Sequence, residues 1–324
     1  MQITDRIYGT VTVEHPLIQR LIASEPLQRL KAISQDGATH FIDPRWDGDR
    51  FEHSFGVWYL AHRFDRPLEE QVACLLHDVP HTAFSHVVDF VMGDDNQEYH
   101  DRFLHQVVMS SEIPAICAEF GMDIATVLDK SSYYLLDNRT PELSFDRWDY
   151  FMRDGYMLGL APREVIELII ASAKLRDGQF YFEDQRVAAL LCLLSINVCR
   201  FGYVSADSHG AWFLLATAIK RGLAVDCITE TDLFTTDALV LEKLQAAHDD
   251  QIDALLARLT PNHPFAYAPK DGAEFYGPNK ARYINPLVEH EGALVPVSHC
   301  ISGLDDEIAA FKERCRFIGV SPKS

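Results

Sequence analysis

The sequence has 324 residues, of which 48% are hydrophobic and 24% are charged, a composition typical of a globular protein and unlike that of a disordered or repetitive chain. Lys and Arg number 29 against 48 Asp and Glu, which gives a formal net charge of −19. This charge repels phosphate polymers and argues against nucleic acid as a partner, whereas a small phosphorylated substrate in a locally cationic pocket is compatible with it.

The cysteines and the N-terminus favour a cytoplasmic protein. The seven cysteines are odd in number and include no Cys-x-x-Cys pair, so we expect them to be reduced. The first residues lack the basic start and apolar run of a secretory signal, and no stretch approaches the pattern of a membrane span. We therefore expect no membrane partner.

The chain is predicted to begin with a short strand or hairpin and to continue as helices. Residues 8–14 alternate β-branched and other side chains, which is typical of a strand. Apolar residues then recur at helical spacing over 17–33, with Pro26 dividing the run into two helices. The stretch 35–50 is dense in Gly, Pro and Asp and is predicted to be a loop whose side chains reach a ligand.

The next two predicted helices carry histidines and an aspartate at their ends. A helix over 52–64 has His53 near its beginning, and a helix over 69–78 ends in His77 and Asp78. Pro80 disfavours helical backbone at the preceding residue and so ends the second helix. Neighbouring residues inside a helix point about 100° apart, so these two side chains can share one ion more readily at a frayed end.

The remainder is predicted to be helical up to about residue 226 and mixed thereafter. Further helices are expected at 97–109, 146–155 and 162–175, and one or two central helices over 187–223. After these we expect two helices ending near 259, a proline- and glycine-rich linker or lid at 260–280, a β-hairpin over 282–297 and a helix over 304–317. We place a soft boundary between a core of residues 1–226 and a C-terminal helical and hairpin extension, 227–324, packed on it.

Four residues have the composition of a metal-ligand set. His53, His77, Asp78 and Asp146 would give a divalent ion two imidazoles and two carboxylates, a mixture that suits Fe, Mn, Ni, Zn or Mg and leaves positions open for water and a phosphate oxygen. Taken singly, each is more simply interpreted as a surface or capping residue. Half of the fourteen histidines lie between positions 53 and 105, however, and this concentration favours one shared divalent metal ion.

Three segments resemble the HD-domain metal-dependent phosphohydrolases. They are RFEHSFGVWYLA (50–61), HDVPHTAFSH (77–86) and FDRWDYFMRDGYMLGL (145–160), and they are most similar to the branch that contains the deoxynucleoside triphosphate triphosphohydrolases. The resemblance covers about the first half of the chain and weakens after Leu160. It implies a mainly α HD-domain helical fold, with small β-hairpin elements at the N-terminus and in the C-terminal region, and a homo-oligomer.

The resemblance also implies roles for histidines outside the ligand set. His81 and His86 match positions that face the bound phosphate groups, where an imidazole can donate to a phosphoryl oxygen. For His86, capping or packing within its own helix is nearly as strong an interpretation. His100, followed by Asp101, resembles the catalytic histidine that transfers a proton, with the carboxylate favouring its charged form and fixing its tautomer. The alternative for His100 and Asp101 is a salt-bridged helix start.

Arg50 and Arg147 are candidate phosphate clamps, because both lie close to ligand positions and a guanidinium matches phosphate oxygens. Family members carry a lysine at the position of Arg147. Lys280 and Arg282 are cations near the C-terminal hairpin, and for these we favour a solvated hairpin edge over contact with phosphate.

Three further residues resemble positions that contact the nucleotide sugar in the triphosphohydrolase branch, namely Gln35, Tyr150 and Asp154. Two departures from the family pattern bear on the substrate. Asp36 replaces an apolar residue next to Gln35, and Pro80 stands at a position that is usually glycine and lacks a backbone donor. Identical substrate choice therefore does not follow from the resemblance.

The sequence thus predicts a metal-dependent phosphohydrolase acting on nucleotides, with hydrolysis of a (deoxy)nucleoside triphosphate to nucleoside and inorganic triphosphate favoured by resemblance. One alternative is a phosphatase or phosphodiesterase acting on another phosphorylated metabolite, such as a nucleoside monophosphate or a signalling nucleotide. Another is a nucleotide-sensing module without catalysis. The complete ligand set argues against the sensor, because binding alone does not require it.

Overall fold

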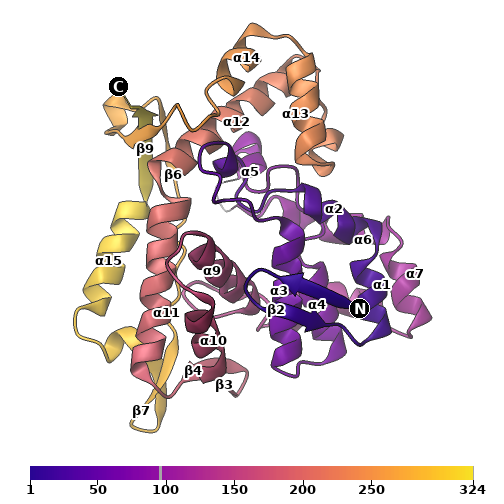
Figure 1. Cartoon of the computed structure of the whole chain (residues 1–324), viewed down its shortest axis with the longest axis vertical. Coiled ribbons are helices and arrows are strands. Elements are labelled where there is room, and N and C mark those ends of the chain that lie inside the picture. The colour runs from indigo at the N-terminus through magenta and orange to yellow at the C-terminus, as the bar shows by residue number, and fades with distance from the viewer. Residues whose placement is uncertain (95–96, 324) are drawn as a thin grey trace.

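The computed structural model describes residues 1–94 and 97–323 and is mainly α-helical (Figure 1), which confirms the predicted fold class. The α-helices are α1 (Pro16–Ile22), α2 (Glu25–Arg29), α3 (Arg50–Arg63), α4 (Leu68–Leu76), α5 (Val87–Met92), α6 (Leu104–Met109), α7 (Ile113–Glu119), α8 (Ile124–Leu128), α9 (Phe145–Met157), α10 (Arg163–Ser172), α11 (Gln185–Val198), α12 (Ala206–Ala224), α13 (Asp237–Ala246), α14 (Asp250–Leu256) and α15 (Leu304–Cys315). The strands are β1 (Gln2–Asp5), β2 (Gly9–Thr12), β3 (Ala173–Arg176), β4 (Gln179–Phe182), β5 (Phe265–Tyr267), β6 (Phe275–Pro278), β7 (Leu287–His290), β8 (Ala293–Pro296) and β9 (Phe317–Pro322).

Helices α3, α4 and α9 form the framework of the candidate site. Helix α3 begins where the Asp49 carboxylate accepts a hydrogen bond from the backbone N–H of Glu52 at 2.8 Å, and α9 begins where Ser144 caps the N–H of Arg147. Helix α3 packs against both α4 and α9, and it buries the aromatic side chains of Phe55 and Trp58. These contacts fix the ends of the three helices close to one another.

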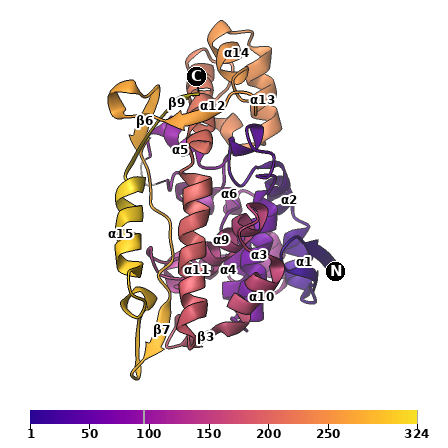
Figure 2. The same cartoon turned by 60° about the vertical axis from the view of Figure 1, so that its left-hand side comes forward.

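The long apolar run forms two helices in sequence. Helix α11 packs against α9, and it is followed by a π-helical turn at Cys199–Tyr203 and then by α12, which continues along the long axis of the molecule (Figure 2). Contrary to the expectation from sequence, Gln185–Tyr203 is long and apolar enough to cross a membrane by length and composition. Of its most apolar window, 61% is buried inside the molecule, as in the core helix of a globular fold.

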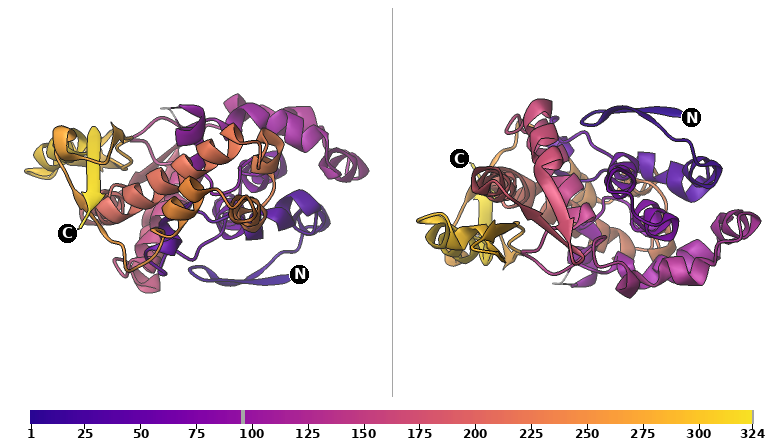
Figure 3. Two further views of the ribbon diagram at one scale, coloured as in Figure 1. Left: turned by 90° about the horizontal axis from the view of Figure 1, so that it is seen from above. Right: turned by 90° about the horizontal axis from the view of Figure 1, so that it is seen from below.

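Three small sheets complete the fold. Strands β1 and β2 form the predicted N-terminal hairpin, and the predicted C-terminal hairpin is β7–β8. Strand β7 also pairs in parallel with β4, which gives a sheet in the order β3-β4-β7-β8. Seen from above and below, the N-terminal hairpin and the C-terminal strand lie on opposite sides of the molecule (Figure 3).

Three local predictions were wrong. The helix expected over 162–175 ends at Ser172 and gives way to β3. The segment 260–280 contains β5 and β6, and both pair with β9, so it is part of a sheet and not a linker or a free lid. The final helix ends at Cys315, and β9 follows it. All three errors concern β-strands. A strand forms only where another segment of the chain lies beside it and pairs with it.

The C-terminal region returns to the central helices. The backbone N–H of Phe265 donates to Asp207 on α12 at 2.6 Å, and its ring lies where a Cβ at Gly210 would come within 2.2 Å of it. Strand β9 packs against α12 as well. The soft domain boundary near residue 226 stays a prediction, but the residues on its two sides are in close contact.

Candidate metal centre and active-site cavity

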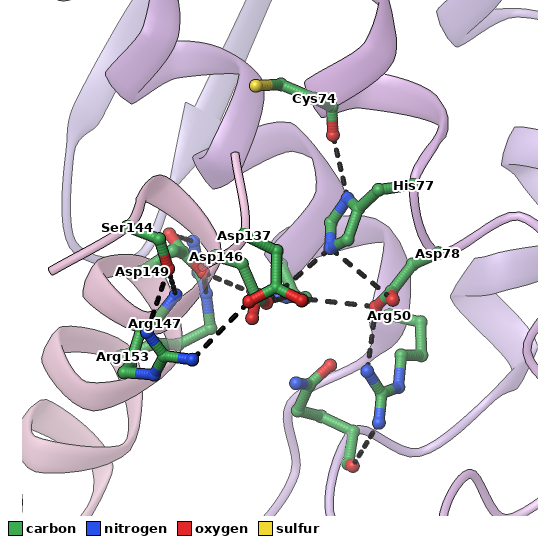
Figure 4. A network of polar contacts seen from close by, with 12 residues as sticks. Arg50, Cys74, His77, Asp78, Asp137, Ser144, Asp146, Arg147, Asp149 and Arg153 are labelled. Atoms are coloured by element: carbon green, nitrogen blue, oxygen red, sulfur yellow. Dashed lines mark hydrogen bonds and ion pairs between the residues drawn. The ribbon is translucent and has the colours of Figure 1, made fainter. Parts of the chain in front are cut away.

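The four predicted metal ligands come together between α3, α4 and α9, and Figure 4 shows three of them, His77, Asp78 and Asp146. His53 lies on the first turn of α3, His77 and Asp78 follow the last residue of α4, and Asp146 lies on the first turn of α9. The Nε2 atom of His53 is 3.0 Å from Oδ1 of Asp146 and 3.7 Å from Oδ2 of Asp78. The Nε2 atom of His77 is 3.6 Å from Oδ1 of Asp146 and 3.4 Å from Oδ1 of Asp78.

The donor atoms of His53, His77 and Asp146 all lie within 4.8 Å of one another, as ligands of one divalent cation do, and the carboxylate of Asp78, which forms a second such group with His81 and His100, lies 3.4 and 3.7 Å from the two imidazoles. Ligands held at about 2.1 Å from an ion lie roughly 3.0–3.5 Å from one another. The Nε2 atom of His77 is buried and has no hydrogen-bond partner among the described residues, so it is free for an ion. Each imidazole is oriented through its other nitrogen, as metal-binding histidines are: Nδ1 of His77 lies 2.8 Å from the carbonyl oxygen of Cys74, and Nδ1 of His53 lies 2.8 Å from Oδ2 of Asp149.

The electrostatics of the cluster favour a positive charge at its centre. Burial by itself lowers the pKa of His53, but hydrogen bonds with Asp146 and Asp149 and the field of Asp78 raise it to about 10. Burial likewise opposes ionisation of Asp146, yet the two imidazoles hold the pKa of this carboxyl well below its usual range. The carboxylates of the cluster thus stabilise positive charge, which is the charge that a divalent cation carries.

A buried network of hydrogen bonds and ion pairs holds Asp149, the partner of the ligand His53. Arg153 donates from Nε and Nη2 to the two carboxylate oxygens of Asp149 at 3.0 and 2.9 Å, and its Nη2 also lies 3.1 Å from Asp5. The hydroxyl of Tyr8 donates to Asp149 at 2.8 Å. Because Asp5 and Tyr8 belong to the N-terminal hairpin and its turn, this hairpin is tied directly to the metal centre.

Gly56 permits the close approach of α3 to this network. A Cβ at this position would lie 1.8 Å from Oδ1 of Asp149 and 2.5 Å from Nη2 of Arg153. We expect Gly56→Ala to lower the free energy of unfolding by about 3 kcal/mol, because the added methyl group must displace a buried ion pair. Urea denaturation measures this. Gly272→Ala, whose Cβ would come no closer than 3.8 Å to its neighbours, is the matched control, and equal unfolding midpoints for the two variants would contradict the prediction.

His81, His86 and His100 form a cluster of imidazoles beside Asp78. The rings of His81 and His100 are stacked with their centroids 3.7 Å apart, and Nε2 of His81 lies 3.4 Å from Oδ1 of Asp78. His86 lies next to both rings, and its Nδ1 is 2.8 Å from Asp89. Burial lowers the pKa of all three, to about 4 for His100. They are therefore neutral at pH 7 and gain protons more readily when negative charge enters the site.

Asp101 does not hold the tautomer of His100, so that part of the sequence prediction was wrong. Its Oδ2 lies 3.8 Å from Nε2 of His100, which is too far for a hydrogen bond, and its other oxygen is paired with Lys130. Asp101 acts on the imidazole through its field, which raises the pKa of His100 against the larger effect of burial. Lys130, which the sequence did not single out, lines the same cavity.

The two arginines predicted as phosphate clamps have other partners. Arg50 is 3% exposed and donates from Nη1 to Oδ2 of Asp78 at 2.7 Å, so it orients a metal ligand. Arg147 donates to the side-chain oxygen of Asn138 at 2.8 Å and to the carbonyl oxygens of Asn138 and Glu142 at 2.7 and 2.6 Å. Both line the cavity, but the hydrogen bonds of Arg147 hold the loop that forms one of its walls.

The residues predicted to contact a sugar lie farther along the same cavity. Tyr150 is one helical turn after Asp146 on α9, and Asp154 is one turn beyond that. The hydroxyl of Tyr203 donates to Oδ2 of Asp154. Burial raises the pKa of Asp154 to about 7, and burial followed by the field of Asp154 raises the pKa of Asp36 well above its usual range.

Lys280 and Arg282 line the cavity, so the preference for a solvated hairpin edge was wrong. Arg282 donates to the side-chain oxygen of Gln97 and lies 6.0 Å from the ring centroid of Tyr203, and Nζ of Lys280 lies 4.0 Å from Glu98. No signal in the sequence could have placed them there, because they precede β7 and are brought to the site by the return of the C-terminal segment.

The cavity has a volume of about 1080 Å³. Every residue predicted for metal binding, catalysis or substrate binding lines it, with the exception of His53, which is 1% exposed and is buried next to Asp146. The predicted residues are thus brought together, whereas their individual roles stay predictions.

Comparisons with known proteins agree with this geometry. The HD domain family model matches residues 50–130. The chain is 35% identical to the uncharacterised protein YdhJ of Bacillus subtilis, over 89% of this chain and 88% of the relative. It is 34% identical to the metal-dependent phosphohydrolase cns2 of Cordyceps militaris, over 53% of this chain and 50% of the relative. It is 28% identical to the deoxynucleoside triphosphate triphosphohydrolase SAMHD1 of Gallus gallus, over 48% of this chain and 34% of the relative.

Among solved structures, a phosphohydrolase from Bacteroides thetaiotaomicron superimposes over the whole of both chains with a TM-score of 0.74 at 17% identity, which shows that the fold is shared. The chain spans about half the length of cns2 and a third of SAMHD1. The metal-ligand geometry, the family match and the near full-length relative together show that this chain belongs to the HD-domain family of metal-dependent phosphohydrolases.

Proposed function

We propose that this enzyme hydrolyses a phosphate ester of a nucleotide in the cavity described above. The first candidate substrate is a (deoxy)nucleoside triphosphate, with nucleoside and inorganic triphosphate as the products. The observation that carries the proposal is a metal-ligand cluster that lines one large cavity together with hydrogen-bonding side chains suited to a sugar. The relationship to proteins named deoxynucleoside triphosphate triphosphohydrolases supports the nucleotide, and this relationship is distant.

The cations of the cavity support a substrate with several phosphate groups. The chain carries a formal charge of −19, and six Lys and Arg side chains line the cavity beside eight Asp and Glu side chains, of which Asp78 and Asp146 are predicted metal ligands whose charge a divalent cation would offset. Four of the cations, Lys130, Arg139, Lys280 and Arg282, come from the segment before α9 and from the C-terminal return. Local cations of this kind outweigh a distant negative surface for a small anion, whereas a phosphate polymer would meet the repulsive surface over its whole length.

Different side chains of the cavity serve metal binding, phosphate binding and proton transfer. His53, His77, Asp78 and Asp146 would hold a divalent cation, which would supply Lewis-acid polarisation of a phosphate oxygen and lower the pKa of water. His81 and His86 can donate to phosphate oxygens, and the neutral His100 can accept a proton from the attacking water or pass one to the leaving oxygen.

Two other functions use the same residues. A nucleoside monophosphate or a signalling nucleotide would engage the same metal cluster with fewer of the outer cations. A nucleotide-sensing module would bind without turnover, but the complete ligand set and the buried imidazoles are more than binding requires. Homo-oligomerisation and a cytoplasmic location stay predictions.

The test is a substrate panel. The manganese-loaded protein is incubated with ribonucleoside and deoxyribonucleoside mono-, di- and triphosphates and cyclic dinucleotides, and the phosphorus products are separated by ion chromatography. Inorganic triphosphate is the expected product. Orthophosphate from monophosphates alone would favour the nucleotidase alternative, and tight binding without any product would favour the sensor.

Lys280 gives a second test, because its side chain is exposed and the ion pair between its Nζ and Glu98 is long, at 4.0 Å. We expect Lys280→Ala to raise KM for a nucleoside triphosphate about tenfold, because a hydrogen bond to a charged group contributes roughly 1.5 kcal/mol. Steady-state kinetics with the triphosphate measure this. Lys312→Ala on the exposed face of α15 is the matched control. An unchanged KM in the Lys280 variant would remove this lysine from the substrate site.

A further inference from the structure

Three buried hydrogen-bond acceptors of the cavity have no donor in the described part of the protein. They are Oε1 of Gln35, Oδ2 of Asp36 and Oδ1 of Asp154. The three residues are 8%, 6% and 1% exposed, and all three line the cavity. Each unsatisfied acceptor costs about 1–3 kcal/mol, so a ligand that brings donors to this end of the cavity is favoured.

Hydrogen bonds fix the residues that carry these acceptors at the cavity. Trp212 donates from Nε1 to the backbone carbonyl of Asp36 at 2.9 Å, and Arg50 donates from Nη2 to the backbone carbonyl of Gln35 at 3.3 Å, so the backbone of both residues is held. The second oxygen of Asp154 accepts from Tyr203, which fixes this carboxyl group itself.

The position of the acceptors relative to the metal ligands defines which part of a ligand meets them. One guanidinium, that of Arg50, spans from the metal ligand Asp78 to the carbonyl of Gln35. Asp154 lies two turns after the metal ligand Asp146 on α9, with Tyr150 between them. When a phosphate lies at the metal cluster, the group attached directly to it, which in a nucleotide is the sugar, lies beside these acceptors.

We propose that Asp36, together with Gln35 and Asp154, binds the neighbouring hydroxyl groups of a ribose, so that this enzyme selects ribonucleotides over 2′-deoxyribonucleotides. This inference rests on the proposed nucleotide phosphohydrolase function and specifies its substrate class. A site built to bind a hydroxyl group discriminates strongly against the analogue that lacks it, because the buried acceptor is then left unpaired. Asp36 is the residue on which the discrimination depends.

The protonation of the two carboxyls favours hydroxyl groups over a cationic amine. Burial raises the pKa of both, and the field of Asp154 adds to this effect on Asp36, so the pair resists carrying two negative charges at neutral pH. A hydroxyl group both donates and accepts a hydrogen bond, and it therefore pairs with a carboxyl group in either state. An ammonium group only donates hydrogen bonds, so it has no acceptor for the O–H of a protonated carboxyl group.

The test compares ribose with 2′-deoxyribose at constant base and phosphate. With the manganese-loaded enzyme, kcat/KM is measured for ATP, GTP, CTP and UTP and for dATP, dGTP, dCTP and dUTP, so that each pair shares its base. Binding of adenosine and of 2′-deoxyadenosine, which need no turnover, is measured by calorimetry. We expect the ribose form to be favoured at least tenfold in both measurements. Asp36→Leu should remove the preference for ribose by lowering kcat/KM for the ribonucleotides. Asp36→Asn should make this preference smaller.

Asp43→Asn is the matched control, because this aspartate lies on the same loop and pairs with Arg45 outside the cavity. Turnover with equal or greater activity on the deoxy forms would overturn the inference and leave the proposed function intact. Absence of turnover with a preference for adenosine over 2′-deoxyadenosine would contradict the proposed function and support the role of Asp36. Absence of both would overturn both, and selection by base alone would assign the acceptors to a base.

Discussion

Asp146→Ala is expected to abolish metal binding and to lower the rate of hydrolysis by at least about a thousandfold, because the cation contributes several kcal/mol of charge stabilisation. Asp146 is the ligand best suited to this test. Its side chain is 22% exposed, Oδ1 is hydrogen-bonded to Nε2 of His53 at 3.0 Å and lies 3.6 Å from Nε2 of His77, and His53 keeps Asp149 as a partner when Asp146 is removed. Elemental analysis after dialysis measures the metal content, and circular dichroism shows whether the helices are retained.

The carboxylate of Asp137 provides the control. It lies in the same cavity and interacts with Asp146 electrostatically, but its partner is Arg147 at 3.4 Å and it is not part of the ligand cluster. Asp137→Asn should therefore keep the metal. Full metal content in the Asp146 variant, or loss of metal only in the Asp137 variant, would show that the ligand set is wrong.

Asp78→Ala should also remove the metal, but the structure predicts a second effect. Arg50 and Asp78 form a buried ion pair with side chains 4% and 5% exposed. Removing the carboxylate leaves a buried guanidinium unpaired, which destabilises a fold by about 3–5 kcal/mol. This variant therefore tests stability and metal binding together, and Asp146→Ala separates the two.

His100→Gln is expected to lower kcat by about a hundredfold or more while leaving the metal content unchanged, because a positioned proton-transfer group contributes about 10²–10⁴-fold. His100 is stacked on His81, and the ligand atoms of Asp78, His81 and His100 all lie within 4.8 Å of one another, so the metal content of the variant decides between proton transfer and metal binding. Pre-steady-state and steady-state hydrolysis rates with the candidate triphosphate measure the loss.

The matched control for His100 lies five residues along the same segment. His105 is exposed on α6 and does not line the cavity, so His105→Gln should behave as the wild type. If both variants hydrolyse substrate at the wild-type rate, His100 has no part in proton transfer. If His100→Gln loses metal as well as activity, the imidazole belongs to the metal site.

Much of the metal centre could be predicted because its residues carry local signals. His77 and Asp78 stand next to Pro80, and this ends α4 so that both side chains leave the helix at its last turn. Asp146 follows Ser144, the N-cap of α9, and His53 lies in the first turn of α3. Helix ends are set by residues within three or four positions, so the sequence itself places each ligand at the end of an element.

The pairing of charged groups could not be predicted, because it depends on residues far apart in the chain. Arg147 was expected to bind phosphate, but the loop at 137–142 takes up its donors. Asp101 was expected to hold His100, but Lys130, 29 residues away, holds Asp101. An arginine or an aspartate matches many partners equally well, and the fold decides which of them comes within hydrogen-bond distance.

The sequence by itself determined the helical framework, the end of each helix that carries a ligand and the types of atoms offered to the cation, because these follow from periodicity, capping and side-chain chemistry over short spans. Only the tertiary structure decided that Lys280 and Arg282 reach the cavity and that Gln35, Asp36 and Asp154 leave three acceptors unpaired within it. The first outcome depends on strands β6 and β9 and on the return of β7 to β4, because Lys280 and Arg282 lie between β6 and β7. Strand pairing of this kind is fixed by partners brought together from different parts of the chain, and a local pattern carries no information about which partner will be adjacent.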